Sequence, residues 1–250
     1  MSTAEEKMLA QRKGAVLCLT INRPLVANAI DSDVAQALVA RLATASRDSL
    51  IHAVILTGTG GDVFSSGRDM NRPATMDANL FERQRRSELV AYSQALLSFP
   101  KPLVVALNGA AIGAGLMLAL HADHVVAASH VYLALPEINL GIATYVGHAL
   151  VADSVGNAIA DRLVLTGRRM GAAEALACRL VDAIVPVGGL KQAAEAAAST
   201  YVAKPPDAFE AMKARILARR RRAFYAALDW AERQGAGLRD RWKDPQSDLH

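Results

Sequence analysis

The sequence contains few of the residues that build disulfide-linked or metal-dependent proteins. Its 250 residues include two cysteines, Cys18 and Cys178, with no CxxC pair and no cluster of cysteine with histidine. This scarcity excludes a disulfide framework and a zinc site of the usual spacing. We therefore expect two reduced thiols and no structural metal.

Aromatic residues and excess charge are also scarce. Phe, Trp and Tyr make up 5% of the chain, and the formal net charge is only +4. No basic stripe is interleaved with aromatic side chains, which argues against a nucleic-acid partner and fits a small anionic ligand better. Hydrophobic residues make up 52% of the chain, enough for a sizeable core in one large domain or one domain with an appendage.

The chain shows no targeting segment and no convincing membrane span. Residues 1–14 are polar and include acids, unlike a signal or transit peptide. Residues 102–122 carry no formal charge and have about the length that a bilayer requires, but Asn108 and three glycines interrupt them. We expect a buried strand, turn and helix there, no contact with a membrane, and a cytoplasmic protein.

Strands and helices alternate along the first half of the chain, and helices dominate the second. Such alternation predicts parallel strands with helices on the sheet faces. The predicted strands are 15–22, 52–58, 102–108, 123–129 and 131–135. The predicted helices are 31–48, 78–99, one from about 113, then 144–165, 171–178, 188–202 and 206–234, before a charged tail. The run of four arginines at 219–222 is interpreted as mostly solvated, or as a contact to a phosphate or an acidic neighbouring subunit.

Three short motifs each follow a predicted strand. They are FSSGRDM at 64–70, NGAAIGAG at 108–115 and LPEINLG at 135–141. Small residues between a strand and a helix aim backbone N–H groups at one point, which suits an oxyanion that develops during a reaction. The third motif supplies a carboxylate instead. Tight packing between helix and sheet is the plainer explanation of the small residues.

These motifs resemble those of the crotonase superfamily, also called the enoyl-CoA hydratase/isomerase family. The resemblance runs from LTINRP at 19–24 to LTGRRMGAAEALACRLVDAIVP at 165–186. It implies an α/β fold, a spiral of ββα turns, as an acyl-CoA-binding core over 1–200, followed by a helical trimerisation region over 201–250. It also implies an acyl-CoA thioester as ligand, a homotrimer or a hexamer of paired trimers, and no cofactor besides the coenzyme A of the substrate.

The resemblance assigns two backbone N–H groups, those of Arg68 and Ala114, to an oxyanion hole. Arg68 stands where relatives usually carry alanine, and we expect its side chain to point away, toward a coenzyme A phosphate or toward Asp69. Small residues let the thioester approach the backbone closely. The substrate and coenzyme A contacts that the resemblance implies are Val26, Ala27, Ser66, Gly67, Arg68, Asp69, Met70, Gly113 and Met117.

The family adds water to a double bond with two glutamates, and the resemblance places them at positions 117 and 137. This chain has a glutamate at the second position only, Glu137. Met117 occupies the other position, and a thioether does not exchange protons at neutral pH. One carboxylate is enough to move a double bond from position 3 to position 2, because it can take the alpha proton and return it to the gamma carbon. We therefore predict an isomerase with Glu137 as its single acid and base. Core packing of Met117 and a surface or capping role for Glu137 stay open.

Tyr145 and His148 stand where the family pattern has glycine. Either side chain could assist at the acyl group, so a hydratase that uses one of them is an alternative. They could also simply narrow the pocket or pack beneath it. A catalytically silent acyl-CoA-binding protein is the third hypothesis. His121 and His124, near the end of the glycine-rich helix, are predicted to be structural.

Overall fold

The structure, a computed structural model, describes residues 4–71 and 74–234. A large sheet has the strand order β1-β2-β3-β5-β7-β10, in which β1 and β2 are antiparallel and all other neighbours are parallel. The central strand β5 is apolar and buried along its length, and β3 is apolar up to Thr57, as expected where helices cover both faces. Its strands are β1 (Met8–Lys13), β2 (Val16–Ile21), β3 (Ala53–Gly58), β5 (Leu103–Leu107), β7 (His124–Ala128) and β10 (Ala183–Val185).

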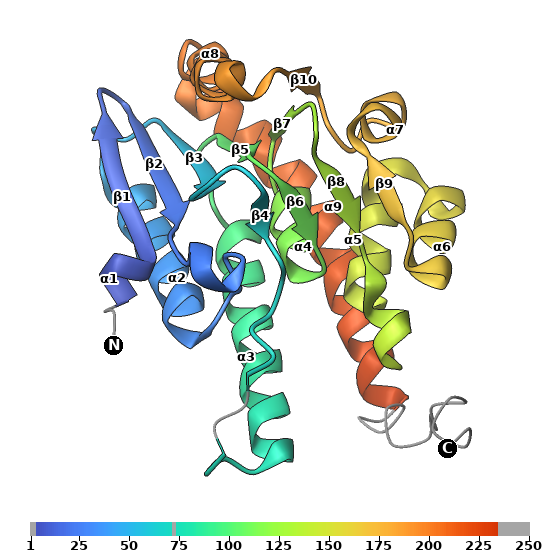
Figure 1. Cartoon of the computed structure of the whole chain (residues 1–250). Helices are drawn as coiled ribbons and strands as arrows, with labels where there is room; N and C mark the ends of the chain where they lie inside the picture. Colours follow the sequence, from blue (N-terminus) through green and yellow to red (C-terminus); the bar gives the residue numbers. More distant parts are fainter. Residues whose placement is uncertain (1–3, 72–73, 235–250) are drawn as a thin grey trace, which may run out of the picture.

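A small second sheet carries the ends of the motifs. Its strands are β4 (Val63–Ser65), β6 (Ala110–Ile112), β8 (Tyr132–Ala134) and β9 (Arg169–Gly171), in that spatial order. Along the chain β4 follows β3, β6 follows β5, and β8 follows β7. Each turn of the chain therefore adds one strand to each sheet, which confirms the predicted α/β spiral of ββα turns (Figure 1).

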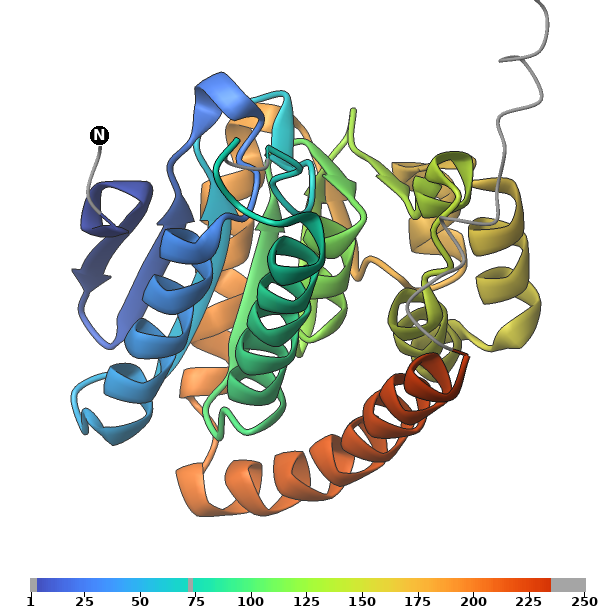
Figure 2. The same cartoon turned by 90° about the horizontal axis from the view of Figure 1, so that it is seen from below.

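Helices cover the two faces of the large sheet. On one face lie α2 (Ser32–Arg47) and α3 (Ala78–Leu97), and on the other lies α8 (Leu190–Val202), as Figure 2 shows from below. The Asp31 side chain caps α2 by accepting a hydrogen bond from the N–H of Val34. A short helix, α1 (Ala4–Lys7), precedes β1. The short helix α4 (Ala114–Leu120) is wholly buried and packs beside β4 and β6.

The uncharged segment 102–122 forms the predicted strand, β5, and the predicted helix, α4, and the turn expected between them contains a further short strand, β6. Within the described residues, no helix is both long enough and apolar enough to cross a membrane.

The C-terminal half is helical, with one difference from the prediction. The single helix expected over 144–165 is two helices, α5 (Tyr145–Val155) and α6 (Asn157–Thr166), because Gly156 between them has a φ of 90°. Beyond them lie α7 (Ala172–Ala177) and α9 (Pro206–Arg233). Residues 235–250 of the predicted 201–250 region lie outside the described residues, and the predicted division at residue 200 stays a prediction.

Helix α9 crosses beneath the sheet and reaches α5, as Figure 2 shows. Lys213 is buried and forms an ion pair of 2.6 Å with Asp123. Arg220 donates to the carbonyls of His121 and Ala122, and Arg221 donates to that of Leu97. The arginine run at 219–222 is thus partly used inside the molecule, to fasten α9 under the end of α4, rather than left wholly in solvent.

Candidate active site

Two loops, one after β4 and one after β6, come into contact at glycine residues. Gly67 has a φ of 93°, and a Cβ built on it would lie 2.8 Å from the Ile112 carbonyl oxygen and 3.1 Å from the Ala114 nitrogen. Only glycine tolerates both this backbone conformation and this closeness. The first two sequence motifs therefore meet through their main chains.

Hydrogen bonds hold the first loop in a fixed orientation. The Ile30 N–H donates to the Gly67 carbonyl at 2.8 Å, and the Asp69 N–H donates to the Ile30 carbonyl at 2.9 Å. The Gly67 N–H donates to the Ser65 hydroxyl. Since these bonds use the residues on either side of Arg68, the Arg68 N–H is left without a partner in the described part of the chain.

The Ala114 N–H is equally free, because Ala114 begins α4 and the first N–H groups of a helix have no intrahelical acceptor. No hydrogen bond of the described residues uses it. The loops that carry Arg68 and Ala114 touch at Gly67. Two unpaired donors on touching loops can bind one carbonyl oxygen and stabilise negative charge on it.

The Glu137 carboxylate lies beside the second of these loops. Glu137 belongs to a 3-10 turn, η2 (Pro136–Leu140), and a Cβ built on Gly113 would lie 3.1 Å from its Oε1 atom. Its Oε2 atom is buried and has no hydrogen-bond partner within the described residues. Burial raises the pKa of Glu137 above its usual value, while the charge of Arg68 and the Thr144 hydroxyl oppose that rise.

Met117 adds a buried apolar surface on the same side of the molecule. Its side chain is 5% exposed, and a Cβ built on Gly147 would lie 2.9 Å from its Cε atom and 2.6 Å from the Thr144 hydroxyl oxygen. Met117 therefore packs against the start of α5, next to the Thr144 side chain that interacts with Glu137. It serves as core and leaves no proton-transfer group at this position.

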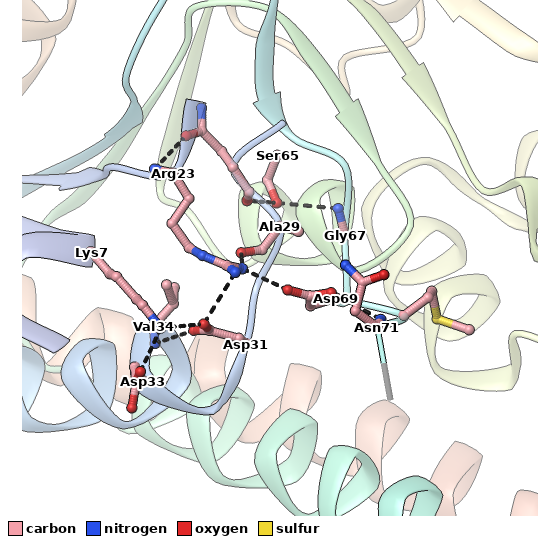
Figure 3. A network of polar contacts seen from close by, with 12 residues as sticks. Lys7, Arg23, Ala29, Asp31, Asp33, Val34, Ser65, Gly67, Asp69 and Asn71 are labelled. Atoms are coloured by element: carbon pink, nitrogen blue, oxygen red, sulfur yellow. Dashed lines mark hydrogen bonds and ion pairs between the residues drawn. The ribbon is translucent and has the colours of Figure 1, made fainter. Parts of the chain in front are cut away.

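Arg68 and Asp69 do not pair with each other, contrary to the partner suggested for Arg68 from the sequence. Asp69 pairs with Arg23 at 2.9 Å, and Arg23 also donates to the Ala29 carbonyl (Figure 3). Arg68 instead points toward α3, where its Nη1 lies 3.9 Å from the Glu82 carboxylate. The Arg23–Asp69 pair fastens the loop, while the Arg68 guanidinium extends toward α3 and stays close enough for its charge to lower the pKa of Glu137.

The segments expected to contact coenzyme A border the same loop. Val26 ends a 3-10 turn, η1 (Pro24–Val26), and is 39% exposed, and Ala27 follows in the left-handed conformation. The Ala27 carbonyl accepts the Ser66 N–H at 3.0 Å. Met70, also partly exposed, follows Asp69 on the other side of the loop. The sequence-predicted segments therefore form one continuous rim.

Tyr145 and His148 face a separate groove of about 520 Å³ between α5, α6 and α9. Asp153, Asn157 and Trp230 are among its other lining residues, and none of Arg68, Ala114, Met117 and Glu137 lines it. The His148 Nε2 lies 2.7 Å from the Asp161 carboxylate, which occupies this nitrogen. The structure thus groups both residues with the helical half rather than with the two free N–H groups.

Two buried asparagines that the sequence analysis did not single out hold the loops together. Asn28 donates to the Val63 carbonyl at 2.8 Å and to the Thr59 carbonyl, and Asn108 donates to the Gly60 carbonyl and accepts the Gly58 N–H. A polar residue directly after an apolar strand, as in PLVVALN, was the signal for Asn108. The sequence gave no comparable indication for Thr144, described above, or for Arg85, described below.

The other histidines near the site have no visible chemical role. His121 is 1% exposed, packs edge-on against Phe224, and its burial lowers its pKa to about 3, so it stays neutral. His124 packs edge-on against Tyr201. Among the described residues, no three His, Cys, Asp or Glu side chains lie close enough together to hold a metal ion.

Comparison with known proteins agrees with this geometry. The chain matches the enoyl-CoA hydratase/isomerase family over residues 11–234 and belongs to it. It is 36% identical over 208 residues to the 2,3-dehydroadipyl-CoA hydratase of Escherichia coli K12, spanning 83% of this chain and 80% of that protein.

Further relatives carry similar names. The carnitinyl-CoA dehydratase of the same strain is 34% identical over 209 residues, which span 83% of this chain and 79% of that protein. The crystal structure of an enoyl-CoA hydratase from Bacillus anthracis superposes with a TM-score of 0.80 at 27% identity, covering 89% of this chain and 90% of that one.

Proposed function

We propose that this protein moves the double bond of a 3-enoyl-CoA to position 2, with Glu137 as its single general acid and base. One observation carries the proposal. Glu137 lies against Gly113, next to the free Ala114 N–H, while Met117 fills the position of the family's second glutamate with an apolar side chain.

The steps follow from the geometry. The thioester carbonyl oxygen accepts hydrogen bonds from the N–H groups of Arg68 and Ala114. Glu137 removes a proton from the alpha carbon, and the electron pair spreads over the carbonyl oxygen and the gamma carbon. Glu137 then returns the proton to the gamma carbon, which leaves the double bond conjugated with the thioester. A carboxylate whose pKa burial raises is a stronger base than an exposed one once it is ionised.

Hydration of a 2-enoyl-CoA is the second candidate, because the relatives named above are a hydratase, a dehydratase and a further hydratase. Glu137 would then activate water without a second carboxylate at position 117. The His148–Asp161 pair and the separate groove of Tyr145 give this candidate no obvious second group. A protein that only binds acyl-CoA is the third candidate.

One assay separates the three candidates. Purified protein receives a 3-enoyl-CoA and, separately, a 2-enoyl-CoA, and the absorbance of the conjugated thioester is followed. We expect a gain from the first substrate that Glu137→Gln lowers by about 10²–10⁴-fold, the usual contribution of a general base. Loss of conjugation from the second substrate would instead establish hydration. Binding without either change would leave a silent binding protein.

The matched control removes a surface carboxylate of the same type. Glu174 pairs with Arg168 on the far helical side and is exposed. Glu174→Gln should leave both rates unchanged, so that a loss confined to Glu137→Gln reports on the site and not on glutamate removal in general.

We also propose a homotrimer, alone or paired into a hexamer. Support comes from family membership and from large apolar side chains exposed on the helical half, among them Leu165 on α6 and Trp230 on α9. Such residues on a protein surface are typical of an interface when they lie together. Light scattering after size exclusion gives the mass directly, and a monomeric mass would contradict this proposal.

A further inference from the structure

Arg85, in the middle of α3, is a buried cation without a matching anion. Its side chain is 5% exposed, and its Nε has no hydrogen-bond partner within the described residues. Its guanidinium makes two uncharged contacts, one with the Met70 sulfur at 3.6 Å and one with the Phe81 ring at 4.9 Å. No carboxylate of the described residues lies within ion-pair distance of it. Buried arginines are rare unless paired, so this one calls for an explanation.

The acidic residues around Arg85 are engaged elsewhere. Asp69 pairs with Arg23, and Glu82 lies 3.9 Å from Arg68. Glu88 accepts hydrogen bonds from the Ser32 hydroxyl at 2.5 Å and from the Gln84 amide at 3.0 Å. These three carboxylates act on Arg85 only from a distance, and no described carboxylate forms an ion pair or hydrogen bond with its guanidinium.

Two further buried polar atoms without partners among the described residues lie within electrostatic reach of Arg68, the neighbour of Arg85. The Tyr92 hydroxyl, two helical turns beyond Arg85, and Glu137 Oε2 have no hydrogen-bond partner in the described chain. The positive charge of Arg68 lowers the pKa of each of the three groups Arg85, Tyr92 and Glu137, in addition to the effect of burial. Arg68 is therefore within electrostatic reach of all three. Buried polar atoms that lack hydrogen-bond partners beside a candidate active site indicate where a polar group of the ligand enters.

The position of Arg85 favours the acyl end of the ligand over its nucleotide end. The rim at Val26 is exposed, and Leu25 beside it is 99% exposed, which suits hydrated phosphates. Arg85 is buried on the inner side of α3, under the flexible Met70 side chain. A carboxylate at the end of an acyl chain can reach the buried Arg85, because the apolar part of the same chain binds in the pocket and brings the carboxylate with it.

We propose that the substrate is an acyl-CoA whose acyl chain ends in a carboxylate, and that Arg85 binds this carboxylate with support from Arg68. The inference deepens the proposed function, because it rests on the thioester carbonyl being held at Arg68 and Ala114. A guanidinium can donate two parallel hydrogen bonds to a carboxylate, and Met70 moves aside to admit it. Arg85 is then a specificity-determining residue, distinct from the group that transfers the proton.

The first test compares binding and needs no turnover. Two saturated six-carbon CoA thioesters are titrated into the wild-type protein, one ending in a carboxylate and one in a methyl group. We expect the carboxylate ligand to bind about 10–100-fold more tightly, as charge-assisted hydrogen bonds in a buried site allow. Equal affinities, or tighter binding of the methyl ligand, would overturn the proposal even if no variant could be made.

The second test changes Arg85 and uses an exposed arginine of the same helix as control. Arg85→Met should remove the preference between the two ligands, while Arg83→Met, which removes the same charge from the solvent side of α3, should keep it. Arg85→Lys keeps the positive charge but loses the planar guanidinium that can donate two parallel hydrogen bonds, so it should retain part of the preference. An equal loss for both ligands in Arg85→Met would contradict the proposal. Melting curves confirm that each variant is folded.

A third comparison separates the acyl carboxylate from the phosphates of coenzyme A. The same two acyl groups are offered as pantetheine thioesters, which lack the nucleotide. If Arg85 binds the acyl carboxylate, the preference survives in the pantetheine thioesters and Arg85→Met removes it there too. If Arg85 binds a phosphate, Arg85→Met weakens both CoA thioesters equally and leaves both pantetheine thioesters unchanged, and the proposal is wrong.

Isomerisation of the matching 3-enoyl substrates is then measured on its own. A carboxylate preference in binding without isomerisation would remove the proposed function and keep this inference. Isomerisation without the preference would do the reverse.

Discussion

The two ends of the candidate site are built from different parts of the chain. At the carbonyl end the proposed donors are main-chain N–H groups, and the contacts that place them are made by glycines and buried asparagines. At the acyl end the proposed working groups are the side chains of Glu137, Met117 and Arg85. The chemistry of the carbonyl end depends on the backbone of two strands and their loops, which most substitutions leave unchanged. The chemistry of the acyl end depends on side chains, so a single substitution can change it.

This difference explains how the chain can depart from its family in some places and not in others. Arg68 replaces a small residue without loss of the N–H donor, since its side chain points away toward Glu82. The same freedom at position 117 removes a carboxylate altogether. The fold therefore keeps the two free N–H groups proposed to stabilise an enolate, while the reaction proposed to follow depends on a few side chains.

At the carbonyl end the largest expected effect comes from changing Gly67. A Cβ at this position would lie 2.8 Å from the Ile112 carbonyl oxygen, so Gly67→Ala forces the two donor loops apart. We expect kcat to fall by about 10²–10³-fold, as when one oxyanion donor is lost. Gly60→Ala is the control, because Gly60 has a similar φ of 86° but nothing within 4 Å of its Cβ position. A similar loss in both variants would show that backbone strain alone is responsible.

A second prediction converts the acyl end toward the family's two-glutamate pattern. Met117→Glu places a carboxylate near Thr144, and we expect hydration of a 2-enoyl-CoA about a hundredfold faster than in Met117→Gln, which has the same shape without the charge. Because Met117 is 5% exposed, the new charge should lower the free energy of unfolding by about 3 kcal/mol. Enzyme assays and urea denaturation measure the two effects. Equal hydration by both variants would show that position 117 does not select the reaction.

Most of the fold followed from apolar runs and small residues. The strands at β3, β5 and β7 and the helices α2 and α3 lie within a residue or two of their predicted bounds, since long periodic segments are decided locally. The three-residue strands β4, β6 and β9 escaped prediction because strands so short have no periodicity of their own. Gly156 divides the helix expected over 144–165 because it has a positive φ, and the neighbouring residues give no sign of this conformation in the sequence.

Site residues that lie within a sequence motif could be predicted. Residues whose role depends on tertiary contacts were harder to predict. Glu137, Arg68 and Ala114 come from motifs, and the structure brings their segments together as expected, although their roles stay predictions. Asp69 was one of two partners suggested for Arg68 and pairs with Arg23 instead, which is distant in the sequence and adjacent only in the fold. Arg85 resembles any arginine of an amphipathic helix until its burial is known.

A third prediction uses the stability of the protein to test the burial of Glu137. Burial raises its pKa, so the folded state favours the protonated form and the free energy of unfolding falls as the pH rises from the ordinary glutamate pKa through the raised one. Glu137→Gln does not titrate and should be more stable than the wild type above this window, while being less active. Glu174→Gln should show the opposite sign, because Arg168 lowers the pKa of Glu174. Urea denaturation at several pH values measures both differences.

The smallest expected effect concerns Arg68, where the two ends of the site meet. Arg68→Ala keeps the N–H donor, so turnover of a methyl-ended 3-enoyl-CoA at the optimal pH should stay within about threefold of the wild type, well below the loss of an oxyanion donor. The guanidinium charge lowers the pKa of Glu137, so its removal should move the acidic limb of the kcat/KM profile to higher pH. A loss of a hundredfold at every pH, with an unmoved limb, would mean that the side chain and not the main chain of Arg68 serves the carbonyl. An unchanged rate with a shifted limb would assign the N–H to the oxyanion and the guanidinium to the charge of Glu137.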